Sequence, residues 1–254
     1  MATTKAKDAE VSIVTLIEGE MKFCILGTSP LVFNRLPEKA RRELLFPQKK
    51  TAATKAANMK HDPIAEFRAS PYRMLDKKAP TVLAVLPTMF KQAMGTAALC
   101  TPGAKRTDID RMVRVDWENL PCYGVPKVFC AITRSADMNR TPDVRTRAIL
   151  PEWACRFTVR FEKPILREQT IADLLSAAGR VSGICDWRQE KGSGSFGSFK
   201  LVSETDKDFQ RILKMGREAQ EDALENWVAY DQDTAELLSW FNVEAKKAGH
   251  MVTA

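Results

Sequence analysis

The stretch Trp153–Glu162, WACRFTVRFE, constrains the fold of this 254-residue chain more than any other part of it. Successive side chains of a β-strand point to opposite faces of its sheet, so alternation of apolar and polar residues predicts a strand with one buried face. The apolar side chains here are Cys155, Phe157, Val159 and Phe161, and they alternate with Arg156, Thr158, Arg160 and Glu162. The sequence therefore predicts a half-buried strand at this place.

Other apolar segments place strands and helices around that strand. Short apolar runs predict strands at residues 21–26, 81–86, 125–132 and 198–202, the first ended by a turn at Gly27–Pro30. Helices are predicted from Pro87, a favoured first-turn residue, and from Thr170, which can cap a helix. Strand, helix, strand, followed by strand, helix, strand, is the split βαβ order. The predicted fold is α+β, with a ferredoxin-like, RRM-like core whose open sheet face is a known RNA-binding geometry.

Charge divides the chain into two parts. Eleven acidic and six basic residues follow Ser203, a net charge of −5, so the first 203 residues carry +12 of the total of +7. We therefore expect an N-terminal arm over residues 1–20, a domain that binds a polyanion over residues 21–203, and an acidic helical tail over residues 204–254. The tail is expected to contact protein, in the same chain or in a neighbouring copy, through Leu237, Leu238, Trp240 and Phe241.

A basic insertion is predicted over residues 35–78, where twelve basic residues stand against five acidic ones. Its stretch 49–60 has almost no large apolar residue, so it cannot pack into a core and is expected to be solvated or ordered by a ligand. The candidate nucleic-acid-binding residues of this insertion are Arg41, Arg42, Lys49, Lys50, Lys55 and Lys60.

A glycine-rich loop over Gly183–Phe199 is the most specific local motif. Glycines free the backbone to expose successive N–H groups, which an anion-binding concavity requires. The candidate binding residues of this loop are Arg188, Lys191, Gly192, Gly194 and Gly197. The competing interpretation is a plain hairpin that buries Phe196 and Phe199, and for those two side chains the core is favoured over a stacking role. No Gly-Lys-Ser/Thr follows, so the loop is not a Walker A motif.

An arginine-rich segment at residues 133–151 is the second candidate. Its candidate binding residues are Arg134, Arg140, Arg145 and Arg147, and Arg156 and Arg160 follow on one face of the alternating strand. Arginine forks suit phosphate oxygens. Asp137, Asp143 and Glu152 neutralise part of this charge, so some of these arginines are expected only to hold the segment in shape.

Groups for catalysis are scarce. The only histidines are His61 and His250, and neither has an acid or nucleophile partner recognisable in the sequence. Asp108 and Asp110 could together hold a metal ion, but a polar turn is the favoured interpretation of this pair. The expectation is a non-enzymatic protein without metal or cofactor. The six scattered cysteines form no C-x-x-C pair, and we find neither a signal peptide nor an apolar run that could span a membrane. The expected location is the cytoplasm.

Four motifs together resemble the RAMP superfamily, and within it the Cas7-type backbone subunits, including Cas7-like proteins of phages and other mobile elements. They are Gly27–Leu31, Leu86–Met94, Arg145–Trp153 and the glycine-rich loop, and the likeness covers roughly residues 20–203. The resemblance implies an RRM-like core with a thumb-like segment at residues 133–151. It also implies that a lysine-rich loop at residues 49–60 holds a nucleic-acid strand, and that copies of the chain stack side by side along one such strand.

The resemblance further implies non-catalytic binding of single-stranded nucleic acid through its backbone. The nucleic acid would be the guide RNA of a CRISPR-type effector, which has other subunits and acts in a prokaryotic cell. Otherwise it would be a single strand bound in a complex encoded by a phage or plasmid. The alternatives are a phage single-stranded DNA-binding or recombination protein, a RAMP-type or metal-dependent ribonuclease, and a phage assembly protein. The sequence leaves RNA and DNA equally open.

Overall fold

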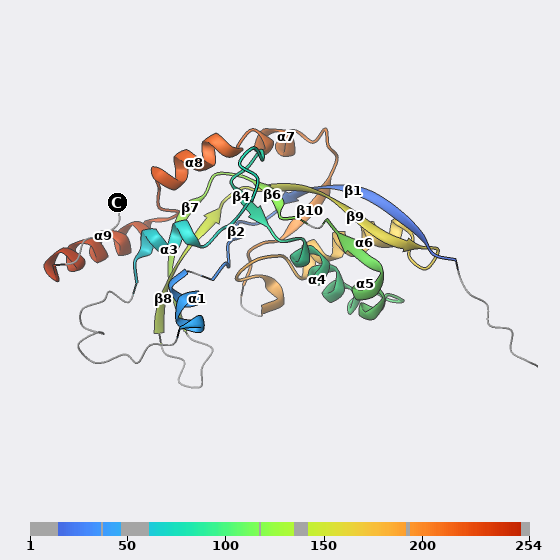
Figure 1. Cartoon of the computed structure of the whole chain (residues 1–254), viewed down its shortest axis with the longest axis horizontal. Coiled ribbons are helices and arrows are strands. Elements are labelled where there is room, and N and C mark those ends of the chain that lie inside the picture. Colours follow the sequence, from blue (N-terminus) through green and yellow to red (C-terminus); the bar gives the residue numbers. More distant parts are fainter. Residues whose placement is uncertain are drawn as a thin grey trace, which may run out of the picture.

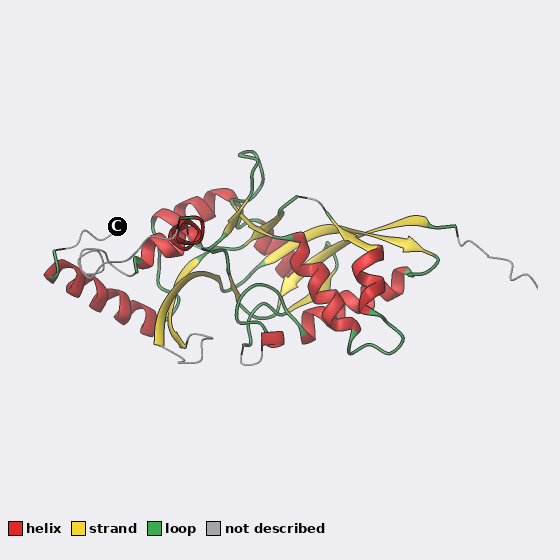
Figure 2. Cartoon of the chain, turned by 60° about the horizontal axis from the view of Figure 1, so that its bottom comes forward, coloured by secondary structure: helices red, strands yellow, loops and turns green. Residues whose placement is uncertain are grey.

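The computed structural model describes residues 15–36, 38–46, 61–116, 118–134, 142–191 and 194–249. These residues form a mixed α+β protein, as the sequence predicts. The molecule is elongated, with a large antiparallel sheet toward one end and a smaller three-stranded sheet toward the other (Figure 1). Figure 2 shows the same division: a long helix lies beside the smaller sheet, and several helices pack on the larger one.

The larger sheet has the strand order β10-β1-β9-β6-β4-β3, with β5 also paired to β9, and every pairing is antiparallel. The alternating segment is the central strand β9, and its apolar side chains are buried as predicted. The strands are β1 (Ile17–Gly27), β3 (Tyr72–Arg73), β4 (Leu83–Val85), β5 (Val113–Val115), β6 (Leu120–Tyr123), β9 (Ala154–Lys163) and β10 (Phe199–Val202).

Three helices cover the apolar face of the strands β1 and β9 (Figure 1): α4 (Pro87–Ala98), α5 (Arg106–Met112) and α6 (Glu168–Val181). Helix α4 begins at Pro87, as predicted. Helix α6 begins before Thr170, with Arg167 at the capping position, so the prediction that Thr170 caps it is wrong. Gly179 lets α6 lie against β10, because a Cβ at this position would overlap the carbonyl oxygen of Phe199.

The smaller sheet has the order β2-β8-β7, formed by β2 (Leu31–Val32), β7 (Lys127–Arg134) and β8 (Pro142–Leu150). Strands β7 and β8 pair from Lys127↔Ile149 to Arg134↔Pro142, so they form a long hairpin. The sequence predicts no strand within the arginine-rich segment at residues 133–151, and the structure has the strand β8 there. Its alternation of Val144, Thr146 and Ala148 is the strand signal, obscured in the sequence by the arginines between them.

The chain after Ser203 is helical, as predicted, and Gly216 lies between its first two helices. The helices are α7 (Lys207–Leu213), α8 (Arg217–Glu225) and α9 (Gln232–Lys247). All three pack on the body. Phe209 and Ile212 complete a second apolar cluster, and the buried Gln220 amide accepts from the N–H groups of Val82 and Leu83 at 2.8 and 3.0 Å. Removing this segment would leave a core and several buried polar groups without partners.

The remaining helices are α1 (Glu38–Leu45), α3 (Pro63–Ala69) and the short 3₁₀ helix η1 (Gln189–Lys191). Helix α3 packs on the hairpin, where the Ser70 hydroxyl accepts from the Ala148 N–H at 2.7 Å. No helix in the described ranges is long and apolar enough to cross a membrane.

Candidate nucleic-acid interface

The predicted binding residues lie in three places. Arg41 and Arg42 are exposed on α1, Arg145 and Arg147 lie on β8, and Arg188, Lys191, Gly194 and Gly197 belong to the glycine-rich loop. Arg134 ends β7. In Figure 1, α1 and the Pro142 end of β8 lie on the same side of the molecule. The other candidates lie outside the described residues: Lys49, Lys50, Lys55, Lys60, Arg140 and Gly192.

The glycine-rich loop uses much of its backbone hydrogen bonding within the protein. The Asp186 N–H donates to the Val32 carbonyl at 2.9 Å, and the Gly197 N–H donates to the Pro30 carbonyl at 2.8 Å. The Phe196 N–H donates to the Trp187 carbonyl at 3.1 Å. These amides join the loop to the edge of the smaller sheet and to itself, so they are not available for an anion as the sequence led us to expect.

The glycines of the loop serve close approach of one backbone segment to another. A Cβ at Gly194 would overlap the Trp187 carbonyl, and a Cβ at Gly197 would overlap the Ile184 carbonyl. Gly197 also has a φ of +73°, in the left-handed region that favours glycine. The two glycines are therefore required by the fold of the loop, which in turn positions its aromatic side chains.

Four partly exposed aromatic side chains meet where the loop reaches the hairpin. The ring of Phe129 on β7 lies 5.2 Å from that of Trp187, 6.0 Å from that of Phe196 and 5.7 Å from that of Tyr230, measured between ring centroids. Phe199 is buried in the core, as predicted. Phe196 is only half-buried, so the prediction that it belongs to the core is wrong. Aromatic rings at a surface offer faces on which unpaired bases can stack.

Two arginines of β8 border this aromatic cluster. Arg147 lies opposite Phe129 in the strand register, and Arg145, two residues before it, lies on the same face of the strand. We name this area the hairpin–loop surface and define it as Phe129, Arg145, Arg147, Trp187, Arg188 and Phe196. Arg188 donates to Glu190 at 2.8 Å and to the Cys185 carbonyl at 3.0 Å, so its guanidinium is already engaged.

Arg147 is the unusual member of the hairpin–loop surface, since it is 9% exposed. Its Nη1 donates to the Thr146 carbonyl at 3.3 Å, and its Nε lies 3.9 Å from an Asp186 carboxylate oxygen. Within the described part of the chain, that Nε has no hydrogen-bond partner. Burial lowers the pKa of the guanidinium, Asp186 opposes this effect, and the charge of Arg145 adds to it. A further anion at this place would offset the free-energy cost of burying the Arg147 charge and the repulsion between Arg147 and Arg145.

The arginines of the larger sheet are in a different situation. We name the side of β1, β5 and β9 away from α4 and α6 the sheet face. Arg114 contacts Glu18 at 2.8 Å and Glu162 at 2.5 Å. Arg160 contacts Glu20 at 3.1 Å and Asp116 at 3.7 Å. These arginines neutralise carboxylates on neighbouring strands, and the open face predicted for RNA binding is a lattice of ion pairs.

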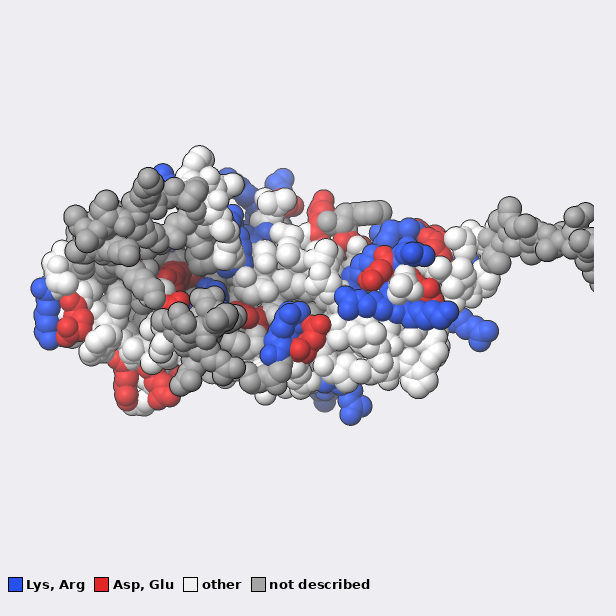
Figure 3. All heavy atoms as spheres, turned by 90° about the horizontal axis from the view of Figure 1, so that it is seen from below, with Lys and Arg blue, Asp and Glu red and all other residues white. Residues whose placement is uncertain are grey.

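Figure 3 shows the side of the molecule opposite the sheet face. Basic and acidic side chains lie intermixed there, over the end of the molecule that holds α4, α5 and α6. On α5, Arg106 and Asp110 form an ion pair with their atoms 3.7 Å apart. The basic excess of the first 203 residues is therefore not gathered into one patch over these helices.

His61 has partners that sequence reasoning missed. Its Nδ1 lies 2.8 Å from a Glu66 carboxylate oxygen, and its Nε2 lies 3.1 Å from one of Asp143 on β8. The hydrogen bond to Glu66 is the main cause that raises the pKa of the imidazole, and Asp143 adds to it. Glu66 is close enough in sequence to be suspected, but only the fold brings Asp143 near. Both ring nitrogens are engaged, whereas a general base requires one of them free to take up a proton.

Other groups considered for catalysis do not converge. Asp108 and Asp110 are two residues apart on α5, so their side chains point in different directions around the helix. No group of three or more His, Cys, Asp or Glu side chains that could hold a metal ion occurs among the residues that the structure describes. Burial raises the pKa of the Cys122, Cys130, Cys155 and Cys185 thiols.

The sequence matches no protein-family model, and no curated protein is detectably similar to it.

Proposed function

We propose that this chain binds single-stranded nucleic acid without cleaving it, and that the hairpin–loop surface makes the contact. Arg145 and Arg147 meet the phosphates, while Trp187, Phe196 and Phe129 lie against the bases. Proteins that bind single strands without sequence preference combine a positively charged surface with aromatic stacking faces in this way. The proposed location is the cytoplasm of a prokaryotic cell, with a phage or plasmid as a possible source of the gene.

The observation that carries the proposal is the combination of Arg147 and Arg145 with partly exposed rings. Arg147 holds a buried Nε without a hydrogen-bond partner in the described residues, directly beside Phe129. Burying a charged group costs free energy unless it is paired, and the 3.9 Å separation from Asp186 is too long for a strong hydrogen bond. A phosphate oxygen supplies the partner that this guanidinium requires.

The strand order supports a ferredoxin-like core within the larger sheet. Taken in chain order as strands one to four, β1, β5 with β6, β9 and β10 lie in the spatial order four, one, three, two. Helix α4 connects the first to the second and α6 connects the third to the fourth, which is the split βαβ arrangement. We therefore propose that this part of the chain is an RRM-like core of the RAMP type, with the hairpin as its thumb-like extension and Cas7-like copies arrayed along a strand.

The test is a binding titration with a fluorescent 30-nucleotide oligo(U) or oligo(dT), followed by anisotropy at several salt concentrations. If about six to ten phosphates are contacted, the slope of log K against log salt should be about −4 to −7 for a single strand. A morpholino oligomer of the same bases has an uncharged backbone and serves as the control, which should bind much more weakly. A flat salt dependence, or equal binding of the morpholino, would contradict the proposal.

The non-catalytic part of the proposal is tested with the same strands labelled at one end. Incubation with Mg²⁺ or Mn²⁺ should leave both RNA and DNA intact. Cleavage that is lost in Asp108→Ala, Asp110→Ala or His61→Gln would replace the binding proposal by that of a nuclease.

A further inference from the structure

The last two residues of helix α1 and the residue after it are apolar and face solvent. Leu44, Leu45 and Phe46 are 75%, 74% and 68% exposed. Single exposed apolar residues are common on protein surfaces, whereas a contiguous group indicates a contact site. Arg41 and Arg42 lie one turn before this group on the same helix and are also exposed. Helix α1 thus presents an apolar knob beside two positive charges.

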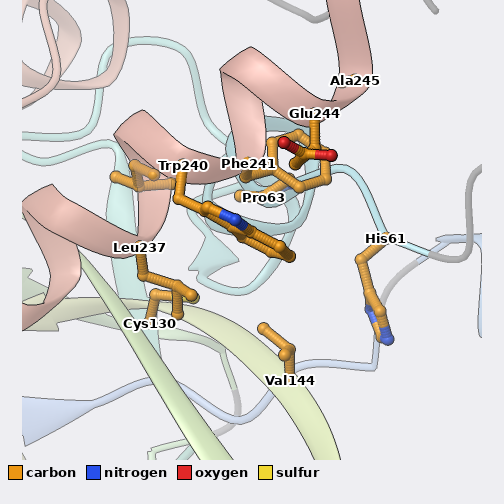
Figure 4. Close-up of a pocket in the computed structure, with 10 residues that line it drawn as sticks. His61, Pro63, Cys130, Val144, Leu237, Trp240, Phe241, Glu244 and Ala245 are labelled. Atoms are coloured by element: carbon orange, nitrogen blue, oxygen red, sulfur yellow. The ribbon is translucent and has the colours of Figure 1, made fainter. Parts of the chain in front are cut away.

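An apolar pocket lies beside the smaller sheet, between α9, the hairpin and the start of α3. Its volume is about 280 Å³. Leu237, Trp240 and Phe241 of α9 form one wall, and Val144 of β8 and His61 stand opposite them (Figure 4). Trp240 is 61% exposed and reaches across the opening.

Water in this pocket would be poorly held. A volume of about 280 Å³ is large enough to admit water. Most of the lining is aliphatic or aromatic carbon, which offers these waters few hydrogen bonds. Replacing them with apolar side chains is therefore favourable. Leu44, Leu45 and Phe46 are side chains of the kind that the pocket accommodates.

Charge favours the basic helix over an acidic or neutral occupant. Between Asp231 and Ala245 the chain has four acidic side chains and no basic one: Asp231, Asp233, Glu236 and Glu244. Glu66 and Asp143 add two carboxylates behind His61. Positive groups near the pocket include His61, when protonated, Lys246, and Lys247, which contacts Glu244 at 2.8 Å. By contrast, residues 35–50 around the apolar knob contain six basic and two acidic side chains.

We propose that the apolar knob of α1 in one copy of the chain docks into the α9 pocket of a second copy. The knob and the pocket are formed by different elements, so the contact joins two unlike patches and can repeat from copy to copy. The inference rests on the proposed function in one respect: copies of the chain follow one another along a nucleic-acid strand. The docking of knob into pocket is then the protein contact between neighbouring copies.

The first experiment measures the mass of the full chain by light scattering over a range of concentrations, without nucleic acid. The wild type should associate as concentration rises, and Leu45→Glu should weaken association at least about tenfold, because it places a carboxylate in the pocket. Leu75→Glu is the matched control: Leu75 is 92% exposed and lies away from both patches, so its mass curve should follow the wild type. A wild type that stays monomeric, or a Leu45→Glu curve equal to that of the wild type, overturns the proposal.

The second experiment identifies the pocket with a labelled peptide of residues 36–46 and the Leu45→Glu chain as its acceptor. The peptide should bind the Leu45→Glu chain. It should bind the double variant, which carries Trp240→Glu in addition to Leu45→Glu, at least about tenfold more weakly. Equal binding to both would overturn the pocket assignment. Tryptophan fluorescence of the wild type and of Leu45→Glu is then compared over a dilution series. If the two differ by the same amount at every dilution while the mass of the wild type stays constant, α1 docks within its own chain and the proposal of a second copy is wrong.

Oligonucleotide binding separates this inference from the proposed function. The Leu45→Glu chain should still bind a ten-nucleotide strand with wild-type affinity. If the wild type self-associates through the pocket but binds no strand, the proposed function fails and the interface stands.

Discussion

The sheet face and the hairpin–loop surface both carry arginines on antiparallel strands, and their arginines have different partners. On the sheet face, Arg114 and Arg160 are held by carboxylates of β1, β9 and the residue after β5. On the hairpin, Arg147 lies opposite an aromatic ring and its closest carboxylate oxygen is 3.9 Å from its Nε. A phosphate at the first surface would have to displace a carboxylate, whereas the proposed contact at the second involves a buried guanidinium whose Nε lies 3.9 Å from an Asp186 carboxylate oxygen.

This contrast shows what decides whether an arginine on a strand is available for a ligand. The residue on the neighbouring strand, directly opposite or one diagonal away, supplies its partner. Glu20 lies opposite Arg160, and Phe129 lies opposite Arg147. The number of arginines in a segment therefore says little about binding until the strand register is known.

The largest effect is expected for Gly194→Val, which tests whether the hairpin–loop surface depends on the fold of its loop. The new side chain would overlap the Trp187 carbonyl, so the loop must rearrange. We expect a loss of about 2–4 kcal/mol of unfolding free energy, together with loss of strand binding. Thermal or urea unfolding and anisotropy on the same variant measure both.

Gly95→Ala is the control for that substitution. Its Cβ would meet the Asp110 side chain at 3.5 Å, an ordinary contact, and alanine is the better helix former. Stability should stay equal or rise slightly, with unchanged affinity. A stable Gly194→Val that binds normally would remove the loop from the interface.

Trp187→Leu sharpens the comparison by removing a stacking face without removing charge. Loss of one stacked base costs about 1–3 kcal/mol, so affinity for oligo(U) or oligo(dT) should fall roughly 10- to 100-fold with the salt slope unchanged. Trp187→Phe keeps an aromatic face and should retain most of the affinity. Equal affinity of the leucine and phenylalanine variants would show that this ring has only a packing role.

Exchanging one arginine from each surface tests the comparison directly. Arg145→Ala should lower affinity several-fold and reduce the salt slope by about 0.7, the value for one phosphate contact on a single strand, with unfolding free energy nearly unchanged. Arg160→Ala should leave affinity and slope as they are and lower stability by up to about 1 kcal/mol, because its partners are partly exposed carboxylates. The reverse pattern would move the binding site to the sheet face.

The smallest effect concerns His61, which ties β8 to α3 behind the hairpin. Its pKa is raised, mainly by the hydrogen bond to Glu66, so the protonated imidazole stabilises the folded state. That contribution is complete below the ordinary histidine pKa of about 6.5 and is lost as pH rises through the raised value. Unfolding free energy should therefore fall by at most about 1 kcal/mol between pH 6 and pH 9.

The variant His61→Gln should show less of this decline in the same pH series, measured by urea unfolding. A decline as steep as that of the wild type would mean that other groups cause it.

Much of the fold could be predicted from local patterns. The alternation of β9 and the start of α4 at Pro87 are each written in a few adjacent residues, and the structure confirms them. The strand β8 was missed because one of its faces includes Thr146 and the other includes two arginines, so polar residues occupy both faces. The division between α7 and α8 was missed because Gly216 acts through close contact with the Pro80 carbonyl, far away in sequence.

The candidate site divides in the same way. Residue types and charge identified the glycine-rich loop and the arginines as features to examine, and the aromatic residues of the loop were visible as well. Phe129 and Tyr230 carried no local signal, since each joins the cluster only through contacts with distant segments. The anion-binding role expected of the glycines depended on free amides. The Gly197 amide instead donates to the Pro30 carbonyl, and the neighbouring Asp186 amide donates to Val32 at the edge of the smaller sheet.

By itself, the sequence determined the α+β class, the half-buried central strand, the division of charge at Ser203 and the residue types available for binding. These follow from spacing and composition, which act over a few neighbouring residues. Only the tertiary structure decided which arginines are neutralised, which rings remain at the surface, and that His61 is held between Glu66 and Asp143. Such pairings depend on strand register and on contacts between segments far apart in the chain, and short-range patterns do not encode them.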